Sequence, residues 1–286
     1  MTNSAYENIF NSIESKANEA IKQNEGDYIL DGLLYCGKCN TKKQTRIEIL
    51  GKIRTPMCLC KCETEKRDAQ YAEFERQQRF LQIEKMRRLG FPESEMFRWT
   101  FAADDKQNPK ISGIMKNYAD NFETMKQRNK GLLLYGSVGT GKSFHAACIV
   151  NDLIDKGYAC LMTNFSRLVN TISGMYDGKQ QYIDSLNRFD LLVIDDLSAE
   201  RDTEFMNEIV FNIIDSRYRA GLPLIITTNL TAEEIKNPAD IRKQRTYSRL
   251  LEMTIPIEVA GVDRRRTKLK NDFAEFSDIL GLNVTE

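Results

Sequence analysis

The segment Leu132-Leu-Leu-Tyr-Gly-Ser-Val-Gly-Thr-Gly-Lys-Ser143 decides the fold of this 286-residue chain. Its second part, Gly136–Ser143, fits the pattern G-x-x-x-x-G-K-[ST], in which backbone N–H groups surround the phosphates of a nucleotide. The apolar residues Leu132–Tyr135 predict a buried strand before this loop, and Phe144–Ile154 predict a helix after it. The pattern requires this strand–loop–helix order, so the segment predicts a phosphate-binding loop in an α/β domain.

The chemistry of phosphate binding explains each residue type in the loop. Three glycines allow positive φ angles, so that N–H groups converge on phosphate oxygens, and the following helix directs its positive dipole end at the same anion. Lys142 supplies a positive charge to the β- and γ-phosphates, and Ser143 supplies a hydroxyl ligand to Mg²⁺. The residues that we expect to contact ATP are Gly136, Ser137, Val138, Gly139, Thr140, Gly141, Lys142, Ser143 and Phe144.

A second apolar run, Asp190–Asp196, ends in two adjacent acids. A continuous apolar run is typical of a strand buried on both faces of a parallel sheet, and ligands bind at the carboxyl ends of such strands. We expect Asp195 to bind Mg²⁺ together with Ser143. We expect Asp196 to orient or deprotonate the attacking water. The alternative is a strand that ends in a solvated acidic turn.

Further polar residues follow the next predicted strand. Leu224–Asn229 ends in Asn229, whose amide is expected to hydrogen-bond the attacking water and the γ-phosphate; alternatively, it caps the next helix. Arg245 and Arg249 are four residues apart and share one helical face, which is alternatively a solvated basic face without a further role. The run Asp263–Lys270 is strongly basic. Its pattern does not distinguish between contact with a nucleotide, contact with nucleic acid and exposure to solvent.

Five of the seven cysteines lie between Cys36 and Cys62. Cys36 and Cys39 form a C-x₂-C pair, and Cys58, Cys60 and Cys62 follow, so the spacing predicts a four-thiolate zinc site in a small ribbon-like module. Zinc takes four ligands and there are five candidates. We favour Cys60 and Cys62 for the second pair, because they run directly into the next helix. The alternative is a set of reduced cysteines in a small β-hairpin.

Composition limits the classes of partner. Lys+Arg and Asp+Glu are 41 each, so any contact with nucleic acid has to come from a local basic patch. No apolar run is long enough for a membrane span, and the first residues lack the pattern of a signal peptide. We therefore expect a cytoplasmic protein without a membrane partner, in which cysteines serve as metal ligands or free thiols.

The chain divides into four predicted parts. Residues 1–29 predict an amphipathic helix with apolar positions at helical spacing, which are Tyr6, Ile9, Phe10, Ile13 and Ala17. Residues 30–62 predict the zinc module with a hairpin over 45–53, and residues 63–95 a charged linker helix. Residues 96–286 alternate strands with helices, which predicts a three-layer α/β domain with a parallel sheet. The predicted strands are Leu132–Tyr135, Cys160–Thr163, Leu191–Asp195 and Leu224–Thr228.

These stretches together resemble the DnaC/IstB-like AAA+ P-loop ATPases, and within them the DnaC-type helicase loaders of bacteria and phages. The resemblance runs from Met96 to Lys270. Besides the phosphate loop, it is carried by Leu192–Leu197, Ser198–Thr203, Asp215–Arg219 and Ile226–Asn229. The cysteine module followed by a charged helix resembles the N-terminal part of phage and Gram-positive loaders. Transposition helper ATPases of the IstB type generally lack such a module.

The resemblance implies a role for each polar residue already singled out. Lys142 and Ser143 match Walker A, Asp195 and Asp196 match Walker B, and Asn229 matches sensor 1. Many AAA+ proteins carry Glu where this chain has Asp196. The shorter side chain would hold water less well, which fits a slow, switch-type ATPase.

The resemblance also assigns the basic residues. Arg249 matches the arginine finger that reaches into the site of a neighbouring subunit. Arg265 matches sensor 2, with Arg264 and Arg266 as alternatives one residue away. Residues 164–176 correspond to a helical insert that faces single-stranded DNA in helicase loaders.

Taken together, the resemblance implies an ATP-dependent helicase loader with ATP, Mg²⁺ and Zn²⁺ as cofactors. Its N-terminal region would bind a replicative DNA helicase, and its AAA+ domain would bind single-stranded DNA and self-associate when assembled. ATP hydrolysis would then release the loader. Two alternatives stay open: an IstB-like transposition helper that binds duplex DNA, and an adaptor that binds ATP without hydrolysing it.

Overall fold

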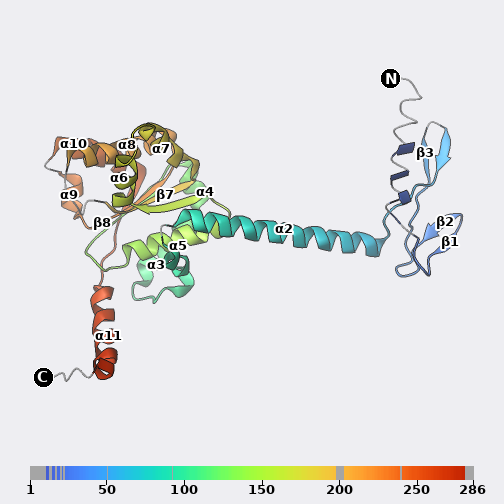
Figure 1. Cartoon of the computed structure of the whole chain (residues 1–286), viewed down its shortest axis with the longest axis horizontal. Coiled ribbons are helices and arrows are strands. Elements are labelled where there is room, and N and C mark those ends of the chain that lie inside the picture. Colours follow the sequence, from blue (N-terminus) through green and yellow to red (C-terminus); the bar gives the residue numbers. More distant parts are fainter. Residues whose placement is uncertain are drawn as a thin grey trace. The chain divides into compact units, whose positions relative to one another are not determined.

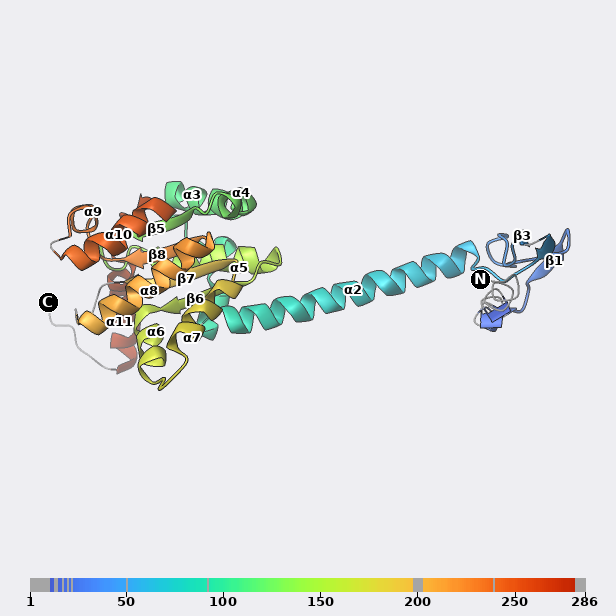
Figure 2. The ribbon, with the colours of Figure 1, turned by 90° about the horizontal axis from the view of Figure 1, so that it is seen from above.

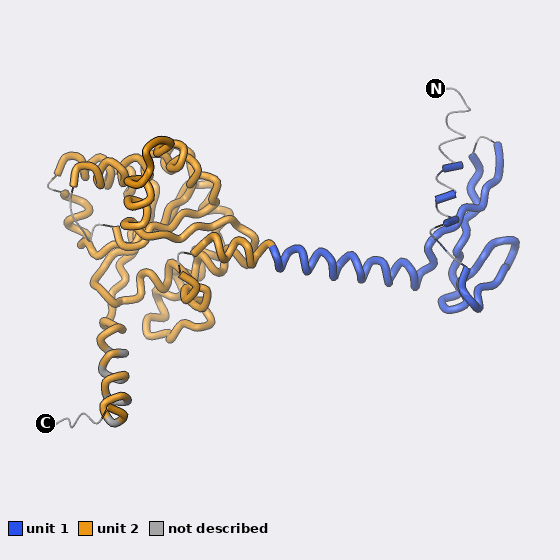
Figure 3. The backbone as a smooth tube through the Cα atoms, in the orientation of Figure 1, with its two compact units in different colours: residues 1–81 blue, residues 82–286 orange. Residues whose placement is uncertain are grey.

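The structure is a computed structural model of the whole chain (Figure 1). It describes residues 11, 12, 15, 16, 18, 19, 21, 23–49, 51–91, 93–197, 203–238 and 240–280, with only the backbone at 267, 268, 270, 271, 274, 275 and 278. The chain forms two compact units, Met1–Leu81 and Gln82–Glu286 (Figure 3). The apolar positions of the predicted N-terminal helix lie outside the described residues, and the four-part division stays a prediction.

A five-stranded parallel sheet forms the centre of the second unit, in the order β6-β7-β8-β5-β9 (Figure 2). The strands are β5 (Gly131–Tyr135), β6 (Cys160–Asn164), β7 (Leu191–Leu197), β8 (Leu224–Thr228) and β9 (Thr254–Glu258). The four apolar runs predicted as strands are therefore strands. The sequence does not predict strand β9, because Ile255 and Pro256 are exposed and break the apolar pattern; a sheet tolerates such a proline at its edge.

Helices cover both faces of this sheet, so the predicted three-layer α/β fold is confirmed (Figure 1). One face packs against α3 (Pro109–Asp120), α4 (Phe122–Gln127) and α5 (Lys142–Asp155). The other packs against α6 (Phe165–Ser173), α7 (Lys179–Ser185), α8 (Glu204–Ala220), α9 (Ala232–Lys236) and α10 (Ile241–Met253). Within β5, Leu132 and Leu134 face the first group and Leu133 faces the second, as expected for a strand buried on both sides.

Shorter elements complete this unit. The 3₁₀ helices η1 (Ser94–Arg98) and η2 (Phe101–Ala103) precede α3, η3 (Leu186–Arg188) precedes β7, and α11 (Arg264–Leu280) follows β9. No helix in the described part of the chain is both long enough and apolar enough to cross a membrane.

A buried arginine fixes the strands that carry the acidic and amide residues. Arg217 in α8 is fully buried, and its guanidinium donates to the carbonyls of Phe189 at 2.8 Å and Pro223 at 2.7 Å. These carbonyls belong to the segments that lead into β7 and β8. Burial lowers the pKa of Arg217 to about 10, so the side chain stays charged and holds both segments.

The first unit contains two hairpins and most of a long helix. The hairpins are β1 (Tyr28–Leu30) with β2 (Leu33–Tyr35), and β3 (Ile47–Ile49) with β4 (Lys52–Arg54). The second hairpin lies in the region that the sequence predicts for one. Helix α2 (Lys61–Gly90) lies where the sequence predicts the charged linker helix, but it begins two residues earlier and ends five residues earlier than the predicted 63–95. The division between the two units falls within this helix.

Candidate functional site

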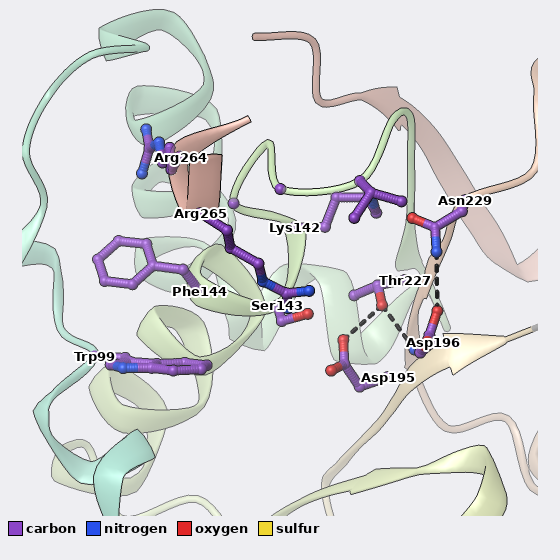
Figure 4. A pocket seen from close by; sticks show the side chains of 13 residues that line it. Trp99, Lys142, Ser143, Phe144, Asp195, Asp196, Thr227, Asn229, Arg264 and Arg265 are labelled. Carbon is purple, nitrogen blue, oxygen red and sulfur yellow. Dashed lines mark hydrogen bonds between the residues drawn. The ribbon is translucent and has the colours of Figure 1, made fainter. Parts of the chain in front are cut away.

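The predicted nucleotide loop and acidic strand meet in one pocket at the carboxyl ends of β5, β7 and β8. The pocket has a volume of about 430 Å³ (Figure 4). It is lined by Trp99, Val138, Gly139, Gly141, Lys142, Ser143, Phe144, Asp195, Asp196, Thr227, Asn229, Arg264 and Arg265. The fold thus brings together residues that are up to 166 positions apart, from Trp99 to Arg265.

The loop after β5 has the backbone that phosphate binding needs. Gly136 and Gly141 have φ angles of 139° and 97°, which side chains rarely tolerate, and a Cβ at Gly136 would lie 2.7 Å from the carbonyl oxygen of Val259. Helix α5 begins at Lys142, directly after Gly141. Its N-terminal N–H groups therefore face the pocket and favour an anion there.

Lys142 is the cation of this loop. Its side chain is buried, and Nζ donates to the carbonyls of Gly136 at 2.9 Å and Ser137 at 2.7 Å. Burial lowers the pKa of Lys142, while the negative charges of Asp196 and Asp195 oppose that shift. An anion in the pocket would stabilise the charged form in the same way as these two acids.

The acidic end of the pocket is a hydrogen-bonded cluster. The Thr227 hydroxyl donates to Asp195 Oδ1 at 2.6 Å, and Asn229 Nδ2 donates to Asp196 Oδ1 at 3.1 Å. The helix after Asn229, α9, is capped by Thr231, whose hydroxyl accepts the N–H of Glu234. The alternative of Asn229 as a helix cap is therefore wrong, and its amide faces the acids (Figure 4).

The donor set fits Mg²⁺. Ser143 contributes a hydroxyl oxygen and Asp195 a carboxylate oxygen to the same pocket, and Mg²⁺ prefers oxygen ligands. Phosphate oxygens of a nucleotide would supply further ligands.

Two of the three consecutive arginines line the pocket. Arg265 extends toward Ser143 and Thr227, whereas Arg264 lies farther from them and pairs with Asp105 at 3.1 Å (Figure 4). The third, Arg266, is exposed outside the pocket. The Arg264 guanidinium also borders the loop, since a Cβ at Gly141 would lie 3.3 Å from one of its nitrogens. Of the three candidates for sensor 2, Arg265 is the one whose side chain extends toward Ser143 and the acids (Figure 4).

Arg249 lies outside the pocket of its own chain. In α10 its guanidinium pairs with Asp215 of α8 at 3.1 Å and lies 4.6 Å from the ring centroid of Phe211. Its side chain is 31% exposed, so part of it remains accessible at the surface. The predicted role in a neighbouring subunit stays a prediction.

Sequence reasoning missed two functional positions in this pocket. Trp99 and Phe144 form an aromatic wall with ring centroids 6.2 Å apart, and only Phe144 was predicted. Trp99 lies 37 residues before the nucleotide loop, between η1 and η2, with no motif around it. Thr227 lay within an apolar run that indicates only a buried strand. The one feature of the sequence that singles out Trp99 is that it is the only tryptophan of the chain.

The predicted single-stranded DNA insert begins where β6 ends. Asn164 caps α6 by accepting the N–H of Arg167 at 2.8 Å. Tyr176 follows α6 and is fully exposed. The structure therefore presents a short helix and an exposed aromatic residue in this segment.

A second candidate site lies in the first unit. One sulfur from each of Cys36, Cys39, Cys60 and Cys62 lies within 4.8 Å of the others. Cys58 is not in this group, and its sulfur lies 3.7 Å from the carbonyl oxygen of Lys42. The structure thus gathers four of the five candidates, with the favoured second pair, and four converging thiol sulfurs suit Zn²⁺.

A buried ion-pair network supports the cysteine cluster. The fully buried Lys43 pairs with Asp27 at 3.0 Å and Glu63 at 3.3 Å. Asp27 also accepts the N–H of Gly37, inside the first cysteine pair, at 3.1 Å. A hydrogen bond with Thr41 is the main cause that lowers the pKa of Cys39 to about 5, whereas burial raises the pKa of Cys60. Cys39 is thus the thiol of the cluster most disposed to the thiolate form that binds a metal.

The strand order and the pocket define a P-loop ATP-binding protein of the AAA+ type. The chain belongs to the family of IstB-like ATP-binding proteins, whose model matches residues 63–244.

Replicative helicase loaders are among its relatives. The chain is 24% identical to the replicative helicase loader DnaI of Bacillus subtilis over 180 residues, 58% of each chain. It is 28% identical to the replicative helicase loader DnaC of Escherichia coli over 104 residues, 35% of this chain and 42% of that one. The matched regions thus cover 58% of the length of DnaI and 42% of the length of DnaC.

Solved structures of such loaders share the fold. The crystal structure of DnaI aligns with a TM-score of 0.52 and 22% identity, covering 63% of this chain and 99% of that chain. The DnaC helicase loader aligns with a TM-score of 0.50 and 21% identity, covering 59% and 100%. At these identities the similarity concerns the fold.

Proposed function

We propose that this protein is an ATP-dependent loader that places a replicative DNA helicase on single-stranded DNA. The observation that carries the ATPase part is the pocket in which Lys142, Asp195, Asp196 and Asn229 converge. The loader part is supported by membership of the IstB-like family and by similarity to proteins named as helicase loaders. This proposal includes a slow, switch-like rate of ATP hydrolysis and a cytoplasmic location. It also includes the replicative helicase and single-stranded DNA as partners.

The two ends of the pocket differ in chemistry, and from this difference we infer the orientation of bound ATP. The aromatic wall of Trp99 and Phe144 offers a stacking surface for the base, and the acids and Asn229 lie at the other end (Figure 4). Lys142 and the N-terminus of α5 lie between them, where the phosphates would pass. This orientation puts the γ-phosphate beside Asp196 and Asn229.

The side chains of the pocket then divide the chemistry. Asp196 orients the attacking water and accepts its proton, and the Asn229 amide fixes that carboxylate. Lys142 and Arg265 stabilise the negative charge that develops on the phosphoryl oxygens. Mg²⁺, held by Ser143 and Asp195, would neutralise charge on the β- and γ-phosphates.

The four gathered cysteines are proposed to bind one Zn²⁺. In this proposal the ion folds the module of two hairpins at the start of α2, and that module binds the helicase. Arg249 is proposed to complete the site of a neighbouring subunit, so full activity requires self-association on DNA or helicase.

Measurement of ATP hydrolysis with no DNA, with single-stranded DNA and with duplex DNA tests this proposal. A loader is expected to show Mg²⁺-dependent hydrolysis that single-stranded DNA changes more than duplex DNA does. A stronger response to duplex DNA would favour the transposition helper. Tight ATP binding with no hydrolysis under any condition would favour the adaptor.

A further inference from the structure

Two adjacent acids line the same pocket, which a regular strand does not allow. Successive side chains of a strand point to opposite faces, yet both Asp195 and Asp196 line the nucleotide pocket. Some local irregularity of β7 therefore has to turn one of them. The structure contains such an irregularity at this point.

Strand β7 carries one extra residue relative to β8. Ile194 pairs with Ile226, but the next pair is Leu197 with Thr228, so three steps on β7 match two steps on β8. Asp196 has a φ of +58°, in the left-handed region that non-glycine residues seldom adopt. This is a β-bulge, which redirects side chains next to functional sites.

The Thr227 hydroxyl joins the two acids across this bulge. Thr227 is buried in β8, and its Oγ1 donates to Asp195 Oδ1 at 2.6 Å and accepts the Asp196 N–H at 2.9 Å. One hydroxyl thus satisfies the backbone amide that the bulge releases and orients the neighbouring carboxylate. The next residue, Thr228, makes a different contact at the end of the bulge, where its hydroxyl donates to the Leu197 carbonyl at 2.7 Å.

We propose that Thr227 is a positioning residue that sets the geometry of the Asp195–Asp196 pair for metal binding and water activation. This proposal rests on the ATPase function proposed above. Thr227 acts through the two acids, because its hydroxyl is already used by both of them. Its loss should therefore affect metal-dependent steps more than nucleotide binding as such.

The test compares Thr227→Val, which keeps the shape but removes the hydroxyl, with Thr227→Ser, which keeps the hydroxyl. Supporting partners of this kind typically change metal affinity or activity about 10- to 100-fold, so Thr227→Val should lower kcat by at least about tenfold. It should also raise the Mg²⁺ concentration for half-maximal stabilisation of bound nucleotide. Nucleotide affinity without Mg²⁺ should stay within about twofold, and Thr227→Ser should recover most of both losses.

Thr246→Val is the matched control. Thr246 is a buried threonine of α10 outside the pocket, and its hydroxyl donates to the Arg242 carbonyl at 3.3 Å. Removing it should change neither kcat nor the Mg²⁺ requirement. Fluorescence of Trp99 in the full chain reports nucleotide binding in all variants, because Trp99 is the one tryptophan and lines the pocket.

The outcomes separate this proposal from the proposed ATPase function. Wild-type rate and Mg²⁺ requirement in Thr227→Val would overturn the positioning role and leave the ATPase function intact. A loss of nucleotide binding that is equal with and without Mg²⁺, and that Thr227→Ser does not rescue, would reduce Thr227 to a structural residue. If the wild-type protein does not hydrolyse ATP, the ATPase proposal fails, and the Mg²⁺ dependence of nucleotide binding still decides the role of Thr227.

Discussion

Lys142 and Asp196 lie in one pocket but are expected to act at different stages of ATP turnover. Lys142 emerges from the nucleotide loop and faces the path of the phosphates. Asp196 sits on a bulge at the end of β7 and is held by Asn229. Substitutions at the two positions should therefore separate nucleotide binding from hydrolysis.

Lys142→Ala should weaken ATP binding. It removes a charge-assisted contact worth about 1.5–3 kcal/mol, so the dissociation constant should rise at least about tenfold. Titration of ATP against the fluorescence of Trp99 measures this change. Lys236→Ala, at an exposed position of α9, is the control and should bind like the wild-type protein. Equal affinity in the Lys142 variant would mean that the lysine does not contact the phosphates.

Asp196→Asn should bind ATP but fail to turn it over. The amide keeps the size and the contact with Asn229 but cannot accept a proton from water. Single-turnover hydrolysis measured beside ATP affinity distinguishes the two effects. If Asp196→Asn hydrolyses ATP at the wild-type rate, this carboxylate is not the group that activates water.

Trp99 and Thr227 line the pocket but could not be predicted from the sequence. Lys142 and the acids were predictable because their spacing is fixed by one loop and one strand. Trp99 reaches the pocket from the short segment between η1 and η2, far upstream of the loop, and its position depends on packing against Phe144. Thr227 acquires its role only through pairing with β7, and no pattern along the chain encodes that contact.

At the scale of elements, long apolar runs were the most reliable signal. Strands β5, β7 and β8 were predictable because they are buried on both faces, whereas the edge strand β9 has exposed residues and a proline. The cysteine spacing predicted the cluster but left five candidates. Which four converge depends on how the hairpin and the start of α2 fold together, and the structure supplies that information.

The cysteine module offers a matched pair of substitutions. Each chain should carry one zinc ion, and Cys36→Ser should lose it and unfold the module locally, because zinc binding of about 10 kcal/mol is also folding free energy. Cys58→Ser should retain the ion, since its sulfur lies outside the cluster. Elemental analysis of both variants measures this, with ATP hydrolysis expected to persist in each. Protein without zinc and with all five thiols reactive would contradict the prediction.

At the scale of the whole molecule, the central question is whether each site needs a neighbour. Arg249→Ala should leave ATP affinity nearly unchanged but abolish stimulation by single-stranded DNA, because an arginine finger acts only across a subunit interface. Mixing Arg249→Ala with Lys142→Ala subunits should restore part of the stimulated rate. Some interfaces would then pair an intact loop with an intact arginine.

Asp215→Asn is the control for that experiment. It weakens the ion pair with Arg249 but keeps the guanidinium, so a role in trans predicts that stimulation persists. Two results together would indicate that Arg249 serves its own subunit. The Asp215→Asn variant would lose stimulation, and mixtures of Arg249→Ala with Lys142→Ala subunits would be as inactive as either variant alone although the subunits co-assemble.

The most direct test of the loader account is a loading assay on a closed single-stranded DNA circle. A ring-shaped replicative helicase is incubated with the circle, the full-length protein and ATP, and the helicase that stays on the DNA is measured. We predict stable loading that requires the protein and ATP and is lost with Lys142→Ala. Equal loading without the protein, or with the Lys142→Ala variant in its place, would contradict the account.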